Sequence, residues 1–249
     1  IPEKVDIIIS EWMGFFLLSE SMLDSVVFAR DKYLKSGGLM FPCSARLYVA
    51  PFTYPEYYKE HVEYWNNVYG YDFSALLPKA KEERLQDMVV AQLCPENEVA
   101  LPNCVVAIDC NTVSALDLNE WHVDLSFDVM IGASVHGFAT WFVVDFPGRH
   151  LWRHSASFCF QNLRQCLPWM TQLLPNPASA LALANLIVPM TNLLTSLSTS
   201  PSAPPTHWGQ TLFFIDDPFP VDQDDTVLGI ATIQRRPNNT RAYTMEVEW

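Results

Sequence analysis

The sequence predicts a mainly β fold of the α+β class, with an antiparallel sandwich or barrel as its largest part. His122–Met130 reads "HVDLSFDVM" and alternates apolar and polar residues, the pattern of a strand with one buried face. Four later segments, "HGFATWFVVDF", "QTLFFID", "TVLGIATIQ" and "AYTMEVEW", are strand-like in the same way. Several strands without intervening helices favour an antiparallel arrangement.

The first forty residues predict a strand, a loop and a helix. Val5–Ser10 is rich in β-branched residues and typical of a buried strand. Apolar residues then recur at helical spacing from Ser19 to Tyr33, and Lys35 with Gly37–Gly38 is expected to end this helix. The loop between a strand's carboxyl end and a helix start is where open α/β sheets bind ligands.

A second helical pattern covers Glu56–Gly70, "EYYKEHVEYWNNVYG", and is unusually aromatic for a surface helix. One interpretation is a core helix of its own domain. The other is an arm that docks on a partner, because exposed aromatic residues mark interfaces. The residues alone leave both open.

Residues 151 to 203 differ in composition from the strands around them. They are rich in Leu, Ala, Ser and Pro, and their apolar part, Ala178–Leu194, is interrupted by Asn185, Pro189 and Asn192. That part is too short and too broken for a membrane span. We interpret about 151–195 as an insertion, partly helical and partly disordered, with no predicted function.

Length and charge limit the classes of function. The chain has 249 residues, 49% of them hydrophobic, enough for one large domain or a domain and a half. Its net charge of −13 argues against nonspecific binding to nucleic acid or to an anionic membrane and favours basic partners. The six cysteines form no CxxC pair, so no metal site is predicted. The start, "IPEKVDIII", shows no signal peptide and no methionine, which suggests a longer protein.

Two glutamates stand in the apolar segment "IISEWMGFFLLSESML". Glu11 follows the predicted strand and Glu20 precedes the predicted helix, and neither has a cation nearby in the sequence. Two carboxylates on one loop suit a guanidinium, because its planar fork of N–H groups donates paired, charge-assisted hydrogen bonds to carboxylates. The alternative is that Glu20 is an acid favoured at a helix start and Glu11 a strand-end charge facing water.

These residues resemble the double-glutamate loop of the protein arginine N-methyltransferases. The family pattern is present as "VDIIISEWMG" followed by "ESML", and the family's THW loop is present as Thr206-His207-Trp208 before a strand. "MFP" and "NNVYGYD" lie between them in the family's order. The resemblance covers residues 1 to about 150 and about 196 to 249, leaving out the insertion.

The resemblance implies roles for individual residues. Glu11 and Glu20 match the glutamates that clamp the substrate guanidinium, with His207 as a proton acceptor or relay. Met22 matches the methionine beside the cofactor and the methyl-transfer centre in type I enzymes, which make asymmetric dimethylarginine. Thr206 and Trp208 belong to the loop that closes the arginine pocket.

The resemblance also implies a domain organisation. Residues 1–40 correspond to the last strand, loop and helix of a Rossmann-like methyltransferase domain, and residues 41–249 to the β-barrel that binds substrate. Residues 55 to about 85 correspond to the helical arm through which the family forms head-to-tail homodimers. The implied substrates are arginine-containing proteins such as histone tails and Arg/Gly-rich proteins, methylated in the nucleus or cytoplasm and there linked to transcription regulation.

The implied methyl donor is S-adenosylmethionine, which the family binds mostly through a glycine-rich turn upstream. The nine glycines of this chain form no GxGxxG pattern. We therefore expect this chain alone to bind the donor weakly and to be inactive by itself. The alternative is a truncated, non-catalytic form that acts only through dimerisation or substrate binding.

Overall fold

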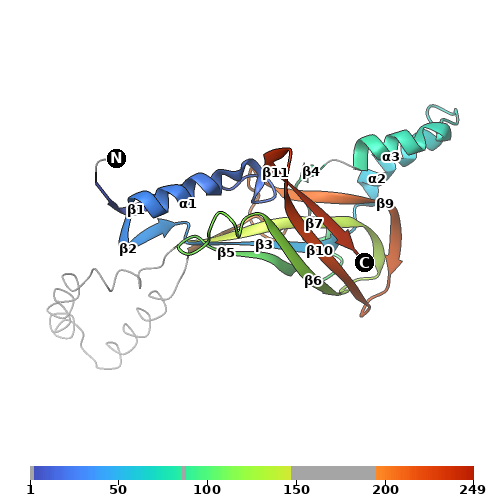
Figure 1. Ribbon diagram of the computed structural model, residues 1–249. Helices are drawn as coiled ribbons and strands as arrows, with labels where there is room; N and C mark the ends of the chain where they lie inside the picture. Colours follow the sequence, from blue (N-terminus) through green and yellow to red (C-terminus); the bar gives the residue numbers. More distant parts are fainter. Residues whose placement is uncertain (1–2, 86–87, 147–194) are drawn as a thin grey trace, which may run out of the picture.

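A computed structural model describes residues 3–85, 88–146 and 195–249 (Figure 1). Strands dominate the described part, which confirms the mainly β prediction. The α-helices are α1 (Met22–Tyr33), α2 (Pro55–His61) and α3 (Leu77–Leu85), and short 3-10 turns cover Ser19–Ser21, Glu63–Asn66, Ser74–Leu76 and Pro95–Asn97. The strands are β1 (Val5–Ile9), β2 (Leu34–Phe41), β3 (Ser44–Phe52), β4 (Val89–Ala91), β5 (Asn103–Asp109), β6 (Glu120–Asp128), β7 (Ala133–Phe146), β8 (Thr195–Ser198), β9 (Gln210–Val221), β10 (Thr226–Arg236) and β11 (Asn239–Glu248).

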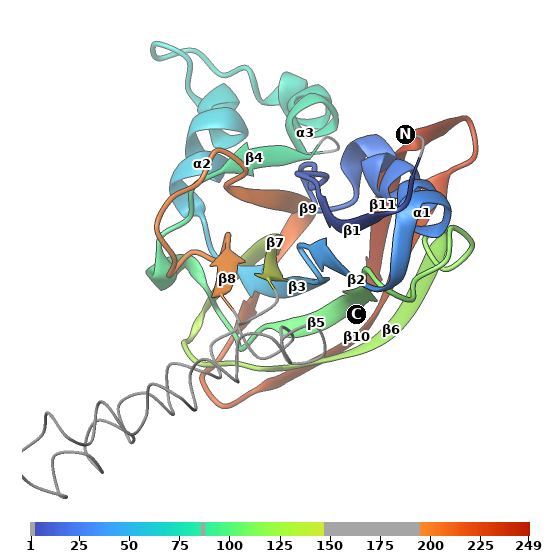
Figure 2. The ribbon, with the colours of Figure 1, turned by 90° about the vertical axis from the view of Figure 1, so that its left-hand side faces the viewer.

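The largest sheet is antiparallel and has the order β4-β9-β7-β3-β5, with β8 added beside the end of β7. A second antiparallel sheet has the order β11-β10-β6. Alternation on β6 is as predicted: Leu125 and Phe127 are buried, while Asp124 and Asp128 are exposed. Figure 2 shows the sheets curving around a common interior, where the inner residues of both belong to one hydrophobic core.

The expected closed barrel is not found among the described strands. Between β5 and β6 a side chain replaces the backbone ladder: Asn103 Nδ2 donates to Ser126 O and Ser126 N donates to Asn103 Oδ1, both at 3.0 Å. Between β9 and β11 a hollow of about 540 Å³ separates the strands, with Ile215 and Val247 in its lining. The two sheets therefore face each other without a continuous ring of strand pairing.

The N-terminal segment differs from the sequence prediction in two ways. The strand β1 pairs in parallel with β2 and is not buried, since Ile7 and Ile9 are 40% and 79% exposed. The helix α1 ends at Tyr33, and the two glycines expected to stop it lie inside β2. At Gly38 a Cβ atom would stand 2.9 Å from Asp6 O, so glycine permits the close approach of β1. These glycines belong to a strand because β2 pairs with β1, and the periodicity of the sequence carries no information about strand pairing.

The predicted aromatic helix is shorter than expected and packs on the chain's own sheet, while docking on a partner stays a prediction. It ends at His61, and the chain turns at Tyr69 and Gly70, whose φ angles are +53° and +91°. The inner side packs on the sheet, where the Tyr57 and Phe214 rings stack with centroids 4.4 Å apart. Beyond α2 four aromatic residues of the arm are exposed, Tyr64, Tyr69, Tyr71 and Phe73, whereas Trp65 is half-buried. In Figure 1 this helical arm projects away from the sheets.

The insertion predicted at about 151–195 lies outside the described residues, except that β8 begins at Thr195. None of the helices in the described part of the chain has the length and apolarity needed to cross a membrane.

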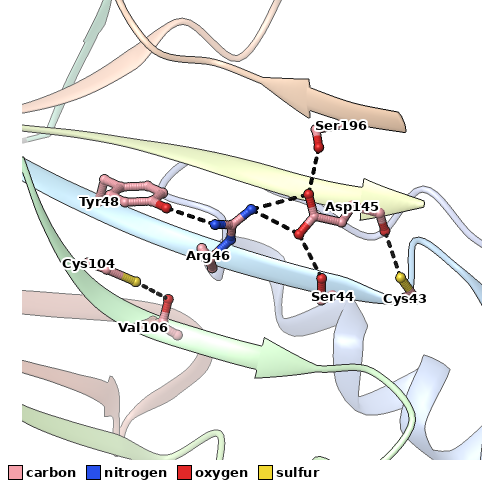
Figure 3. Close-up of polar contacts among 8 residues, drawn as sticks. All are labelled: Cys43, Ser44, Arg46, Tyr48, Cys104, Val106, Asp145 and Ser196. Carbon is pink, nitrogen blue, oxygen red and sulfur yellow. Dashed lines mark hydrogen bonds and ion pairs between the residues drawn. The ribbon is translucent and has the colours of Figure 1, made fainter. Parts of the chain in front are cut away.

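A buried carboxylate ties β3, β7 and β8 together (Figure 3). Asp145 accepts hydrogen bonds from Ser44 Oγ at 2.9 Å, from Ser196 Oγ at 2.7 Å and from Arg46 Nη2 at 3.0 and 3.2 Å. Burial alone would raise the pKa of Asp145, but the bonds from the two serines and the charge of Arg46 outweigh burial and lower that pKa below its usual value. The folded protein therefore stabilises the ionised carboxylate.

Replacing this carboxylate should destabilise the fold in a pH-dependent way. Asp145→Ala removes the charge-assisted bonds, and we expect the free energy of unfolding at pH 7 to fall by about 1–3 kcal/mol. This loss in the free energy of unfolding is fully present above pH about 4, the ordinary pKa of a carboxyl group in the unfolded chain. It disappears as the pH falls through the lower pKa that Asp145 has in the folded protein. Urea unfolding measured between pH 3 and 7 checks this.

A matched control is Lys79→Ala, because Lys79 pairs with Glu82 and Glu83 on the exposed side of α3. We expect that variant to change stability by less than about 0.5 kcal/mol. An Asp145→Ala effect that is equally small, or that stays constant down to pH 3, would contradict the assignment.

Candidate functional site

The loop after β1 has a strained backbone, with left-handed residues and a position that only glycine fits. Gly14 N donates to Leu17 O at 3.0 Å, closing a tight turn. A Cβ atom on Gly14 would lie 2.1 Å from Ser19 O, so only glycine fits there. Phe16, Leu17 and Glu20 have φ angles of +56°, +59° and +74°, in the left-handed region that non-glycine residues rarely adopt. Strain of this kind clusters at functional sites and persists only where surrounding contacts hold it.

The surrounding contacts come from the far end of the chain. Trp208 Nε1 donates to Met13 O at 2.9 Å, and Phe16 N donates to Thr211 Oγ1 at 3.1 Å. The Trp208 ring packs edge-on against Phe142 of the large sheet. The predicted double-glutamate loop is therefore held by two buried hydrogen bonds, one from Trp208 of the predicted THW loop and one to Thr211 of β9.

These two loops enclose a small hollow of about 160 Å³. Its lining contains five of the six residues predicted for the site: Glu11, Glu20, Met22, His207 and Trp208. The lining also contains four neighbours that the sequence analysis did not assign: Trp12, Met13, Gly14 and Phe15. Trp12 is buried, and its indole N–H has no hydrogen-bond partner within the described residues. Buried donors without a partner are rare in folded proteins.

Thr206 is the predicted site residue that does not line the hollow. Its carbonyl accepts a hydrogen bond from Gln92 Nε2 at 2.7 Å and another from Gly209 N at 3.2 Å. Its Oγ1 is buried and unpartnered in the part of the chain that the structure describes. In this geometry Thr206 shapes the turn that presents the neighbouring His207.

The polar side chains at the hollow are accessible to water. Glu11, Glu20 and His207 are exposed, and the His207 ring lies against the Trp208 ring with centroids 3.8 Å apart. Glu20 has one cation close by, Arg241 on β11, whose Nη2 is 3.9 Å from Glu20 Oε2. Within the described ranges no ion pair involves Glu11. The hollow thus combines two carboxylates, an aromatic wall and an imidazole, a suitable receptor for a planar cation.

The start of α1 is fixed to the β10–β11 hairpin. Arg235 donates from Nη1 and Nη2 to the two oxygens of Asp24 at 2.7 and 3.1 Å, and also donates to the Tyr243 hydroxyl. Tyr243 in turn donates to Leu118 O at 2.8 Å. Burial raises the pKa of Tyr243, while the hydrogen bond to Asp24 is the main cause that raises the pKa of Arg235. This network holds the first turn of α1, which contains Asp24 and begins at Met22.

Comparison with known proteins places the chain in a family. The sequence profile described as "Arginine methyltransferase oligomerization subdomain" matches residues 43–168 and 186–249. A probable protein arginine N-methyltransferase 6 of Arabidopsis thaliana is 38% identical over the whole chain, which spans 55% of that relative. Human protein arginine N-methyltransferase 2 is 33% identical over the whole chain, which spans 49% of it. The chain thus spans about half the length of these curated relatives.

Solved structures show the same fold. The open conformation of Arabidopsis protein arginine methyltransferase 10 matches 99% of this chain and 66% of its own, with a TM-score of 0.69 and 28% identity. The Trypanosoma brucei PRMT1 enzyme–prozyme complex matches 100% of this chain and 69% of its own, with a TM-score of 0.72 and 24% identity. The segments "HGFATWF" and "STSP" predict a particular likeness to arginine methyltransferase 6, the name of the Arabidopsis relative above. The chain belongs to the protein arginine N-methyltransferase family.

Proposed function

We propose that the protein is a type I protein arginine N-methyltransferase, for which this chain supplies the arginine pocket. The observation that carries the proposal is the hollow in which Glu11 and Glu20 meet His207 and Trp208 from the opposite end of the chain. The names of the two relatives support arginine methylation in general. A solved PRMT6-SAH structure, 25% identical to this chain, supports S-adenosylmethionine as the methyl donor.

The hollow fits the acceptor better than the donor. Its volume of about 160 Å³ is below the roughly 300–1,000 Å³ of pockets for drug-sized ligands. A guanidinium group fits such a space, and an entire S-adenosylmethionine does not. The described residues therefore bind and orient arginine, while the donor requires walls beyond this hollow. The same observation favours a second candidate function, a non-catalytic chain that binds substrate or a partner subunit.

The chemistry that these residues perform follows from the properties of arginine. A guanidinium stays protonated, with a pKa of roughly 12.5–13.8, and its delocalised nitrogens are poor nucleophiles. Glu11 and Glu20 hold the cation by hydrogen bonds on two edges, which points one terminal nitrogen in a fixed direction and draws positive charge onto the rest. Orientation and preorganised charge are the main catalytic contributions in such a site. His207, exposed at the rim, accepts the proton that the nitrogen loses on methylation.

The helical arm is the proposed contact between subunits of a homodimer. Its exposed large side chains are Tyr64, Tyr69, Tyr71, Phe73 and Leu76. Aromatic side chains of this kind are enriched in interfaces, and the family profile is itself named for oligomerisation. The proposed substrates are histone tails and Arg/Gly-rich proteins, modified in the nucleus or cytoplasm.

Removing either clamp carboxylate should abolish turnover while sparing peptide affinity. We expect Glu11→Gln or Glu20→Gln, in a protein that carries this chain behind a family cofactor domain, to lower turnover at least about a hundredfold, or roughly 3 kcal/mol. The substitution removes the charge but keeps the size of the side chain. It therefore destabilises the transition state more than it weakens peptide binding. Methyl transfer to an Arg/Gly-rich peptide, with the products separated by mass, measures rate and dimethylarginine type together.

The matched control is Asp6→Asn, which removes an exposed carboxylate that pairs with Lys35 outside the hollow. Turnover of that control should stay within about twofold of wild type. The clamp assignment is wrong if either glutamine variant keeps more than about a tenth of wild-type turnover, a loss below about 1.4 kcal/mol. A symmetric product would leave the clamp intact and overturn the type I assignment.

Loosening the two loops should slow turnover without removing a charge. Trp208→Phe keeps the aromatic wall but deletes the indole N–H that binds Met13 O. We expect turnover to fall by about tenfold or more, because misplacement by about 1 Å is costly in a preorganised site. Hydrogen exchange at the amide of Gly14, which bonds Leu17 O, should speed up. Unchanged exchange there would contradict the idea that Trp208 holds the loop.

A further inference from the structure

The outer face of the β11-β10-β6 sheet carries large aliphatic side chains at its centre. Strand β10 is the middle strand of this sheet, and its inner residues Ala231 and Ile233 are buried in the core. Alternate residues of β10 point outward, and two of them, Leu228 and Ile230, are 65% and 46% exposed. The solvated face of an antiparallel sheet is usually polar. We call Leu228 and Ile230 the aliphatic ridge, and none of the roles assigned so far uses it.

Carboxylates flank the aliphatic ridge on both sides. On β6, Asp124 is the register partner of Ile230, and Asp128 lies on the same face of that strand. On β11, Glu248 is the register partner of Ile230, and Glu246 lies beside it on the same face. All four of these flanking carboxylates are exposed, and within the described ranges none of them takes part in an ion pair. The ridge therefore lies between two rows of unpaired negative charge.

The charge of this face argues against three kinds of occupant. A second copy of the chain would bring the same four carboxylates onto these four and would be repelled. An anionic membrane and a nucleic acid are disfavoured for the same reason, and the net charge of −13 adds to the repulsion. His122 on the same face pairs with Glu120 and so does not compensate the flanking carboxylates. The face is therefore complementary to a partner that is both apolar and basic.

The spacing of the two rows of carboxylates suits a helix. Neighbouring strands lie about 4.8 Å apart, so rows on the strands either side of β10 are roughly 10 Å apart. An α-helix with its side chains is about 10–12 Å wide. A helix with an apolar stripe on the ridge therefore places lysines or arginines from each flank within reach of one row. The methylene stems of those residues cover the adjacent aliphatic surface.

We propose that this face is the docking site for a basic amphipathic helix of another protein. Leu228 and Ile230 contact the apolar stripe of the helix, and the flanking carboxylates accept charge-assisted hydrogen bonds from its basic side chains. An exposed apolar patch with a polar rim is typical of such interaction sites. None of these residues lines the hollow that contains Glu11 and Glu20. The docking site is therefore separate from the proposed arginine pocket and does not rest on it.

The experiment measures binding of a fluorescein-labelled peptide to the 249-residue chain by anisotropy at 0.15 M salt. The peptide has about four helical turns of lysine and leucine, with the leucines on one face, and a scrambled peptide of the same composition has no apolar stripe. Because neither peptide contains arginine, the result is independent of the arginine pocket. We expect the amphipathic peptide to bind at least about tenfold more tightly than the scrambled one.

Two pairs of substitutions test the two parts of the docking site. Leu228→Thr with Ile230→Thr removes the aliphatic ridge but keeps residues that favour strands, and it should weaken binding of the amphipathic peptide about tenfold. Asp124→Asn with Glu248→Gln removes one carboxylate from each row, and it should weaken binding about threefold or more.

Each pair has a matched control elsewhere on the surface. Ile9→Thr with Leu76→Thr removes two exposed aliphatic residues, and Glu82→Gln with Glu83→Gln removes two exposed carboxylates of α3. Both controls should bind the amphipathic peptide within about twofold of wild type. The proposal is overturned if the ridge variant binds as tightly as wild type, if the scrambled peptide binds as tightly as the amphipathic one, or if wild type binds neither. A dimer in sedimentation velocity that only the ridge variant loses would make the occupant a second copy and overturn it as well.

Discussion

The contact between Trp208 and the loop after β1 determines where the charged groups of the candidate site lie. Two buried hydrogen bonds, Trp208 Nε1 to Met13 O and Phe16 N to Thr211 Oγ1, join segments 195 residues apart. In a buried setting, losing one partner leaves the other unsatisfied, which costs more than the bond contributes net. The loop contains left-handed residues that are unfavourable by themselves. It keeps its shape because Trp208 of the THW turn and Thr211 of β9 hold it, so the geometry of the candidate site depends on tertiary packing.

Two arginines on one hairpin have different physical roles near this loop. Arg235 is 15% exposed, contacts both oxygens of Asp24 and also binds Tyr243, so removing it leaves the partly buried carboxylate of Asp24 without its ion pair. Arg241 is 72% exposed and 3.9 Å from Glu20, a pair of the kind that contributes about 0–1 kcal/mol. The first holds the structure, and the second can be exchanged for a ligand at low cost.

Local sequence patterns predicted the parts of the fold that local physics decides. The alternation on β6 and the strands β7, β9, β10 and β11 were predicted from local patterns, and all of them are found; β7 is buried on both faces and does not alternate. Pairing between strands determined the parts of the fold that local patterns did not predict. Gly37–Gly38 stops a helix in isolation but joins β2 because β1 is adjacent, and the closed barrel fails where Asn103 substitutes for a strand ladder. The site glutamates were found through the family pattern, whereas Arg241 was missed because 220 residues of chain separate it from Glu20.

The pairing of β7 with β8 determines where this fold can accommodate changes in the length of the chain. Phe146 and Thr195 are register partners, so the chain leaves the sheet and returns at adjacent positions, and Asp145 bonds Ser196 beside them. The entropy of closing such an excursion grows only with the logarithm of its length, about 0.6 kcal/mol for each doubling. Once the ladder fixes the two ends, a change in the number of residues between them costs little conformational entropy. The β7–β8 junction is therefore a position where the fold can accommodate a change in chain length while the sheet keeps its register.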